Sequence, residues 1–444
     1  MLSLIFRIGK INLTFVNEYI QFGIKPVNHV MFPTKIINDP IYGFIKINNP
    51  FILELIDHPF FQRLKRIKQL GLAEFVYPGA HHTRFHHALG AMHLMDQALN
   101  NLKAKGYNIS EKEQEAAEVA ILLHDIGHGP FSHVLENTIL NEVKHEEVSN
   151  LLMKKLNEHF KGRLSLAIEM FNNRYNRPFF HQLISSQLDV DRLDYLSRDS
   201  FYTGVREGFI GSERLLSMLD LKNEQLVLEE KGIYSIENFL MARRLMYWQV
   251  YLHKTAIAAE TMLIQILRRA KDLMAQGIKL NCSKPLHVFL SRTYTWDEFA
   301  SNEKLLLAFT DLDDHDIWAA LKDWKNEKDK ILRHLCESFL TRKLFKCKLG
   351  TQPLPKSKIT EIESKIQESL GIGFEELSYF VVEGSTSNAA YVQGDNTIKM
   401  VDKQGQVVEL MLASDLPTIQ ALSKIVKKYY FCCPKSVYLQ GELS

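Results

Sequence analysis

The chain has 444 residues, 46% of them hydrophobic and 24% charged, a balance typical of a folded globular protein rather than a disordered one. Its formal net charge of +2 gives no overall attraction to nucleic acid or to a membrane surface, so an anionic ligand must be held by local clusters. The five cysteines lack paired metal-binding spacing and favour reduced thiols in a cytoplasmic protein.

The first residues predict neither a signal peptide nor a membrane span. Their short apolar run is interrupted by Arg7 and Lys10, and no later segment approaches the length that a bilayer requires. Recognisable patterning begins at Lys35, so residues 1–34 are interpreted as a lead. Met31 is an alternative start, which would make that lead over-extended.

Residues 35–47 alternate around a turn and predict a small hairpin. The pattern is then helical from about residue 50 to 275. We expect a helix over 85–103, a helix that starts at the Ser110–Glu113 capping box and carries His124 and Asp125, and one long helix over 236–274.

A second capping box, Thr295 with Glu298, predicts further helical structure to about residue 346. Residues 350–358 resemble a linker because they are rich in proline and glycine. Beyond it the sequence predicts a helix over 358–369, strands over 378–384, 389–393, 396–402 and 406–411, and a helix over 415–427.

These elements predict a mainly α fold in four segments. A lead (1–34) precedes a helical core with a small N-terminal hairpin (35–275), a helical extension (276–349) and a smaller C-terminal α+β region (350–444).

The most informative stretch is 121–133, which places His124 beside Asp125 and adds His128 and His133. Nine of the 17 histidines lie between residues 81 and 145. On a helix, His124 and Asp125 are about 100° apart and both reach one ion at the edge of a buried face. Further ligands are available in the pairs His86–His87 and Asp189–Asp191.

Two imidazoles and two carboxylates would hold a divalent ion and leave positions open for water and a phosphate oxygen. Iron, manganese, magnesium and zinc all fit such ligands. The alternative interpretation is a set of capping and salt-bridging residues near a helix end.

Seven strings, in this order, resemble those of the HD-domain metal phosphohydrolases. The resemblance extends to the deoxynucleoside triphosphate triphosphohydrolases, which include the sterile-alpha-motif-linked enzyme of animals. The strings begin at Lys35, Phe61, Tyr77, His124, Lys144, Asp189 and Tyr251 and cover about residues 35–270. The resemblance implies an HD-domain helical core, with metal ligands His87, His124, Asp125 and Asp191.

The same resemblance places His128, His133, His145 and Glu146 at a hydrolytic site. It implies attack of water on the α-phosphorus, with release of a deoxynucleoside and intact triphosphate. A protonated His133 or His145 would assist the leaving oxygen. His128 has an alternative role, that of orienting a metal ligand.

Substrate contacts are also implied. Arginines suit bidentate phosphate binding, and the Tyr195 hydroxyl would add a further phosphate contact. In the family, counterparts of Gln69 and Asp199 hold the 3′-hydroxyl, and counterparts of Leu70 and Tyr251 leave no room for a 2′-hydroxyl. The expected set is Gln69, Leu70, Arg84, Arg192, Tyr195, Asp199, Arg243, Tyr247 and Tyr251. Tyr247 replaces a histidine of the animal enzyme and Glu136 replaces an aspartate. The alternative for Leu70 and Tyr251 is ordinary core packing.

Family members are commonly homo-oligomers, often tetramers, activated by nucleotides. Residues that match a guanine-nucleotide regulatory site are Lys35, Asn38, Asp57, Gln62 and Lys65. A solvated helix face is the alternative for the last three. Glu229 stands where the animal enzyme has a basic residue, and a carboxylate there would repel the phosphate of a second activator.

Two alternative functions fit the same residues, and a second His-Asp pair has a separate interpretation. The same metal site would serve a phosphodiesterase or nucleotidase, and a nucleotide-binding regulatory protein with vestigial activity is the other alternative. The pair His315–Asp316 lacks accompanying ligand strings, and we interpret it as a helix cap.

Overall fold

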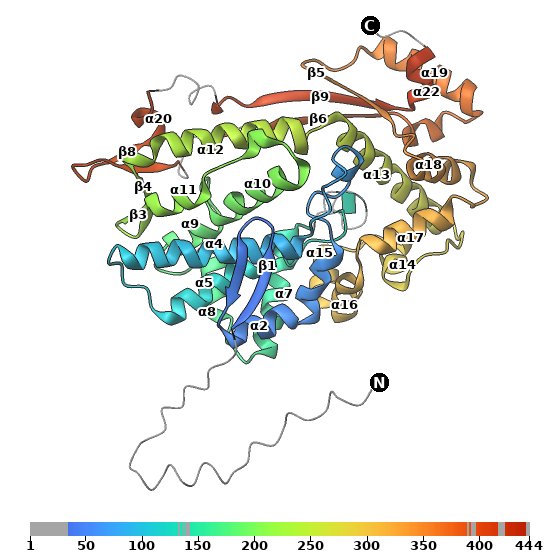
Figure 1. The fold of residues 1–444 in the computed structure, drawn as a ribbon. Coiled ribbons are helices and arrows are strands. Elements are labelled where there is room, and N and C mark those ends of the chain that lie inside the picture. Colours follow the sequence, from blue (N-terminus) through green and yellow to red (C-terminus); the bar gives the residue numbers. More distant parts are fainter. Residues whose placement is uncertain are drawn as a thin grey trace, which may run out of the picture.

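The computed structural model describes residues 34–131, 134–135, 138, 143–388, 390–391, 397–415 and 422–440. Helices dominate, and small sheets lie at the N-terminal hairpin and along the C-terminal part (Figure 1). The predicted mainly α fold is therefore confirmed. Among the described helices, none combines the length and the apolar character needed to cross a lipid bilayer.

The predicted hairpin is confirmed as β1 (Lys35–Asp39) and β2 (Gly43–Ile47), which pair in antiparallel fashion. Its turn is organised by Asp39, whose Oδ1 accepts hydrogen bonds from the backbone of Ile41 at 2.9 Å and of Tyr42 at 3.1 Å. Gly43 closes the turn with a φ of 75°, a conformation that glycine adopts without strain.

Three helices form the centre of the core: α4 (Arg84–Ala104), α5 (Glu111–Leu123) and α10 (Val190–Thr203). The predicted capping box at the start of α5 is confirmed, with Glu113 N donating to Ser110 Oγ at 3.3 Å. The other elements of the core are α2 (Pro50–Asp57), α3 (Pro59–Gln62), η2 (Arg63–Arg66), η3 (Ala73–Phe75), α7 (His145–His159), α8 (Ser165–Phe171), α9 (Phe179–Ile184), η4 (Arg206–Gly208), α11 (Ser212–Met218) and η5 (Glu230–Gly232).

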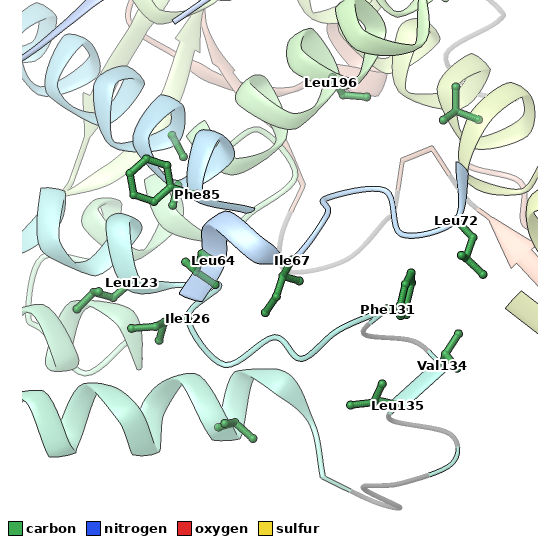
Figure 2. Packing of buried hydrophobic residues seen from close by; sticks show 14 of the residues in the cluster. Leu64, Ile67, Leu72, Phe85, Leu123, Ile126, Phe131, Val134, Leu135 and Leu196 are labelled. Carbon is green, nitrogen blue, oxygen red and sulfur yellow. The ribbon is translucent and has the colours of Figure 1, made fainter. Parts of the chain in front are cut away.

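The expectation that α5 carries His124 and Asp125 is wrong by one or two residues, because His124 is the C-terminal cap of α5. Helix α5 ends at Leu123, and the chain continues in tighter turns whose hydrogen bonds span three residues, from Ile126 N to Leu123 O and from His128 N to Asp125 O. Figure 2 shows Leu64, Leu123 and Ile126 close together where this loop begins. The loop thus rests on the apolar core.

The single long helix expected over 236–274 is also wrong. The chain forms α12 (Ile233–Met246), a π-helical turn η6 (Tyr247–Tyr251) and α13 (Lys254–Ala275). The second helix has its own cap, because His253 Nδ1 accepts a hydrogen bond from Thr255 N at 3.1 Å. The prediction of helical structure over 50–275 is also incomplete, because β3 (Leu219–Lys222) and β4 (Gln225–Glu229) form a hairpin there.

The predicted capping box at Thr295 is confirmed, and the segment 276–349 is mainly helical. Its helices are α14 (Lys284–Ser291), α15 (Trp296–Ser301), α16 (Glu303–Asp311), α17 (Asp314–Trp324) and α18 (Lys330–Leu340). The pair His315–Asp316 is confirmed as part of a helix cap. Asp313 accepts a hydrogen bond from His315 N at 2.9 Å, and its own N–H donates to Asp316 at 2.8 Å.

The C-terminal α+β region is confirmed, with shifted boundaries. Its elements are β5 (Lys346–Gly350), α19 (Lys356–Leu370), η7 (Glu375–Tyr379), β6 (Val382–Asn388), β7 (Lys399–Val401), β8 (Val407–Glu409), α20 (Leu410–Ala413), β9 (Val426–Cys433) and α22 (Lys435–Gln440). Strand β9 lies between β5 and β6, and β7 joins β4 in parallel. A strand at 389–393 is absent from the described residues there, 390–391. Of the expected helix over 415–427, residues 416–421 lie outside the description, and its predicted end is wrong because Val426 begins β9.

Candidate metal centre

Three segments far apart in the sequence meet at one point of the core. His87 lies in the first turn of α4, His124 follows the last residue of α5, and Asp191 lies in the first turn of α10. Helix α4 packs on both other helices. The meeting point is therefore fixed by helices and not by loops alone.

The side chains from these segments converge on a small space. His87 Nε2 lies 3.3 Å from His124 Nε2 and 3.1 Å from Asp191 Oδ1, and His124 Nε2 lies 3.5 Å from the same carboxylate oxygen. Among the described residues, these three form a group whose ligand atoms all lie within 4.8 Å of one another. They are three of the four ligands that the resemblance implies.

The chemistry of this donor set fits a cation. His87 Nδ1 faces Asp194 Oδ2 at 2.7 Å, and His124 Nδ1 faces the carbonyl oxygen of Ile121 at 2.6 Å. Because both partners accept, each Nδ1 donates, and each neutral ring presents a lone pair on Nε2. Two lone pairs that face each other at 3.3 Å repel unless a proton or a metal ion lies between them.

The protonation equilibria agree with a site built for positive charge. Burial alone would lower the pKa of His87, but hydrogen bonds to Asp191 and Asp194 outweigh it and raise this pKa to about 10. Burial likewise opposes ionisation of Asp191, yet the neighbouring His124 and His87 hold the pKa of its carboxyl well below the usual range. A divalent ion would replace the proton on these ligands.

Asp125, the fourth expected ligand, borders the centre but has other partners. Its Oδ1 lies 3.4 Å from His124 Nε2, and its Oδ2 lies 3.8 Å from His87 Nε2. The same carboxylate accepts a hydrogen bond from Arg84 at 2.7 Å and lies 3.3 Å from His128 Nε2. Arg84, expected at the substrate, is thus paired with Asp125 in this structure.

Of the expected catalytic residues that are described, His128 lies beside Asp125. The His128 ring stacks on His145 with centroids 3.8 Å apart. Burial and the charge of Arg84 lower the pKa of His128 to about 3, so its ring is neutral near pH 7. Glu146, 3.4 Å from His145 Nε2, is largely exposed. His133 and Glu136 lie outside the described residues.

A second group of expected residues surrounds Asp199. This carboxylate is buried, and it bonds to Tyr251 Oη at 2.7 Å and to His82 Nε2 at 2.7 Å. The Tyr251 ring packs edge-on against Tyr195 and Tyr247. Leu70 is half-buried against the core.

The expected phosphate-binding arginines carry buried nitrogen atoms that have no hydrogen-bond partner within the described part of the chain. These atoms are Arg192 Nε and Arg243 Nε and Nη1, and Gln69 Oε1 is equally unpartnered. Burial and Tyr247 raise the pKa of the Tyr195 hydroxyl, whereas the charges of Arg192 and Arg243 oppose that rise. Unsatisfied buried donors of this kind are costly unless a ligand accepts from them.

The expected regulatory residues lie at the hairpin and at the segment 57–65. Lys35 and Asn38 are exposed on β1, and Asp57 is exposed at the end of α2. Gln62 donates to Ile56 O at 2.7 Å, and Lys65 Nζ lies over the Phe85 ring at 4.6 Å.

Several supporting residues were not identified from the sequence: Arg63, His82, Asp194 and Arg198. Asp194 and Arg198 form an ion pair one helical turn apart, with Arg198 Nη2 2.9 Å from Asp194 Oδ1. Their spacing on α10 is the one signal that could have revealed this pair. Arg63 and His82 act across long sequence separations, which leave no local pattern.

The chain matches the family models described as HD domain, over residues 84–199, and HD associated region, over residues 210–281. It is 52% identical in sequence to a phosphohydrolase from Bacteroides thetaiotaomicron whose crystal structure is known. The match covers 90% of this chain and 100% of that protein's chain, with a TM-score of 0.88.

Two other relatives are more distant. The uncharacterized protein YwfO of Bacillus subtilis is 31% identical over 92% of this chain and 94% of its own. The deoxynucleoside triphosphate triphosphohydrolase SAMHD1 of Homo sapiens is 28% identical over 78% of this chain and 59% of its own.

Proposed function

Because the chain belongs to the HD-domain phosphohydrolase family, we propose that it hydrolyses deoxynucleoside triphosphates to a deoxynucleoside and inorganic triphosphate. The observation that carries the proposal is the convergence of His87, His124 and Asp191. It is supported by buried nitrogen atoms of Arg192 and Arg243 that have no hydrogen-bond partner within the described residues. The named triphosphohydrolase among the relatives supports the substrate class.

Each group of residues has a role in this proposal. His87, His124, Asp125 and Asp191 hold a divalent ion, which would supply Lewis-acid chemistry by polarising a phosphate oxygen. Bidentate contact from Arg192 and Arg243 then positions the triphosphate, since their buried nitrogens need acceptors.

Proton transfer and sugar recognition fall to the remaining residues. His128 stays neutral at pH 7 and orients Asp125, whereas His145, or His133 outside the described residues, gives a proton to the leaving 5′-oxygen. Gln69 and Asp199 hold the 3′-hydroxyl, while Leu70 and Tyr251 exclude a 2′-hydroxyl. The proposal extends to a cytoplasmic homo-oligomer with an activating nucleotide at Lys35, Asn38, Asp57, Gln62 and Lys65.

Product identification tests the proposed reaction. Metal-supplemented protein is incubated with each deoxynucleotide and each ribonucleotide, alone and in mixtures, because an activator-dependent enzyme is silent on single substrates. Inorganic triphosphate and a deoxynucleoside are expected. Release of diphosphate or monophosphate instead would support a phosphodiesterase or nucleotidase, and binding without turnover would support a regulatory protein.

A pair of variants tests the site. Asp125→Ala removes a carboxylate from the centre and is expected to abolish turnover. Asp316→Ala, in the other His-Asp pair, removes only a helix cap and is expected to leave turnover unchanged. Full turnover by Asp125→Ala would refute the site.

A further inference from the structure

A continuous chain of buried polar side chains connects the N-terminal hairpin to the metal centre. Asp39 Oδ2, at the end of β1, accepts from Arg198 Nη1 at 2.7 Å. Arg198 in turn donates to both oxygens of Asp194, from Nε at 3.0 Å and from Nη2 at 2.9 Å. Asp194 Oδ2 then accepts from His87 Nδ1 at 2.7 Å.

These four linked side chains are buried from solvent. Asp39 is 6% exposed, and His87, Asp194 and Arg198 are each 0% exposed. Removal of one partner from a buried ion pair leaves an uncompensated charge, so each member depends on its neighbours. The two carboxylates and one guanidinium sum to one negative charge, which a cation at His87 balances.

Packing leaves little freedom for these groups. A Cβ atom at Gly90 of α4 would lie 2.0 Å from Asp194 Oδ1 and 2.2 Å from Arg198 Nη2. Helix α4 thus approaches α10 only because residue 90 has no side chain. Asp194 and Arg198 fill the space that this glycine provides.

The two carboxylate oxygens of Asp39 have different partners, one in the hairpin turn and the other on α10. Oδ1 accepts from the backbone of Ile41 and Tyr42 and shapes the turn, while Oδ2 holds Arg198. The conformation of the turn therefore determines where Arg198 lies. Arg198 determines where Asp194 lies, and Asp194 sets the orientation of the His87 ring.

We propose that Asp39 is a positioning residue for the metal ligand His87, acting through Arg198 and Asp194, so that the β1–β2 hairpin and the metal centre are energetically coupled. This inference rests on the proposed function only in requiring that the centre binds a divalent ion. It adds that whatever binds or displaces the hairpin changes metal affinity. By linkage, metal binding stabilises the hairpin to the same extent.

Metal affinity provides a readout that does not depend on turnover. Metal-free full-length protein is titrated with Mn²⁺ in a calorimeter. Asp194→Asn, which alters the group that contacts His87, is expected to weaken Mn²⁺ binding about 10- to 100-fold. Asp39→Asn keeps an oxygen for the turn but loses the charge, and we expect about tenfold weaker binding.

A double variant separates coupling from general damage. If Asp39 acts through Asp194, adding Asp39→Asn to Asp194→Asn causes no further loss of Mn²⁺ affinity. Asp329→Asn is the matched control, because it breaks the partly buried ion pair with Arg269, which lies outside the network from Asp39 to His87. This control is expected to bind Mn²⁺ as the wild type does.

Hydrogen exchange of the unmodified protein gives an independent test that does not require any variant to fold. Amide exchange in residues 35–47 is expected to slow when Mn²⁺ is added. Unchanged exchange in the wild type, wild-type affinity in Asp39→Asn, or additive losses in the double variant would each overturn the coupling. Wild-type protein that binds Mn²⁺ but releases no triphosphate would refute the proposed reaction and leave the coupling standing, whereas failure to bind any of Mn²⁺, Mg²⁺, Fe²⁺ and Zn²⁺ would refute both.

Discussion

Arg63 fixes the loop that follows α5, although it lies about sixty residues earlier. Its guanidinium donates to the carbonyl oxygens of Ile126 at 3.0 Å and of His128 at 2.8 Å. The side chain is 1% exposed and lies over the Phe309 ring at 4.9 Å. One cation therefore holds both sides of the turn that begins at Asp125 and ends at His128.

Replacement of Arg63 by methionine should leave two buried carbonyl groups without donors. We expect Arg63→Met to lower the free energy of unfolding by about 3 kcal/mol and to reduce turnover, because His128 loses its fixed position. Urea denaturation and steady-state kinetics measure the two effects. Arg66→Met is the control, since Arg66 is about half exposed and its pair with Asp313 contributes little. Equal stability of the two variants would contradict this role for Arg63.

At the residue scale, the sequence was informative where ligands are close in sequence or lie in a familiar string. His124 and Asp125 are adjacent, and His87 and Asp191 each lie within a string that the resemblance identified. The partners of these residues were not predicted. His82 reaches Asp199 and Arg63 reaches Ile126 only after folding, because no local period relates such distant positions.

At the scale of elements, the fit between the loop and α7 depends on Gly127. A Cβ atom at this position would lie 2.3 Å from His145 O and 2.3 Å from Ser149 N. Both atoms belong to the α7 backbone and cannot move aside by side-chain rotation. Ser149 Oγ also accepts from Gly127 N at 2.9 Å and donates to His124 O at 2.7 Å. The loop and α7 therefore pack as one unit.

Gly127→Ala should force α7 away from the metal centre. We expect a loss of about 2–3 kcal/mol in the free energy of unfolding, together with a large fall in turnover, since His145 begins α7. Gly211→Ala is a suitable control, because the nearest atom to its added Cβ is Arg214 Cβ at 3.9 Å, an ordinary contact. Similar stability for both alanine variants would show that α7 adapts freely.

Asp314 joins the helical extension to the core and predicts a pH dependence of stability. Its Oδ2 accepts from Lys68 N at 2.9 Å, and burial raises its pKa to about 6. This carboxyl binds its proton more tightly in the folded state than in the unfolded state. Its ionisation therefore removes stability as the pH rises from about 4 to about 6.

Asp314→Asn keeps an oxygen acceptor for Lys68 and carries no charge. We expect it to stabilise the protein by about 2 kcal/mol at pH 7.5, with a much smaller gain at pH 4.5. Urea denaturation at the two pH values measures the difference. Asp311→Asn, which changes an exposed carboxyl, should give no such dependence. A gain of equal size at both pH values would rule out ionisation as its cause.

The elements themselves were predicted best where capping residues and a regular apolar period agree. Ser110 and Thr295 begin helices as expected, and α4 follows its apolar face closely. The interruption at η6 was missed, because Tyr247–Tyr251 contains neither glycine nor proline. The β3–β4 hairpin was missed for a similar reason, since Asn223 and Glu224 adopt positive φ without a glycine.

At the scale of the whole molecule, the candidate metal centre joins parts of the chain that are remote in sequence. His87, His124 and Asp191 come from three helical segments, and the buried chain through Asp194 and Arg198 adds the hairpin. A ligand that bridges such segments binds the folded state and not the unfolded chain, where the same side chains are far apart. Metal binding should therefore contribute to the stability of the whole core.

Chelation should consequently lower the melting temperature. With Mn²⁺ at a hundred times its dissociation constant, binding adds about 2.7 kcal/mol to the free energy of unfolding, which corresponds to a shift of about 3 °C in a chain of this length. Differential scanning calorimetry with and without a chelator measures this shift. Asp191→Asn, which removes a carboxylate charge from the centre, should melt at nearly the same temperature in both conditions. A chelator effect that persists in this variant would place the responsible metal ion elsewhere in the molecule.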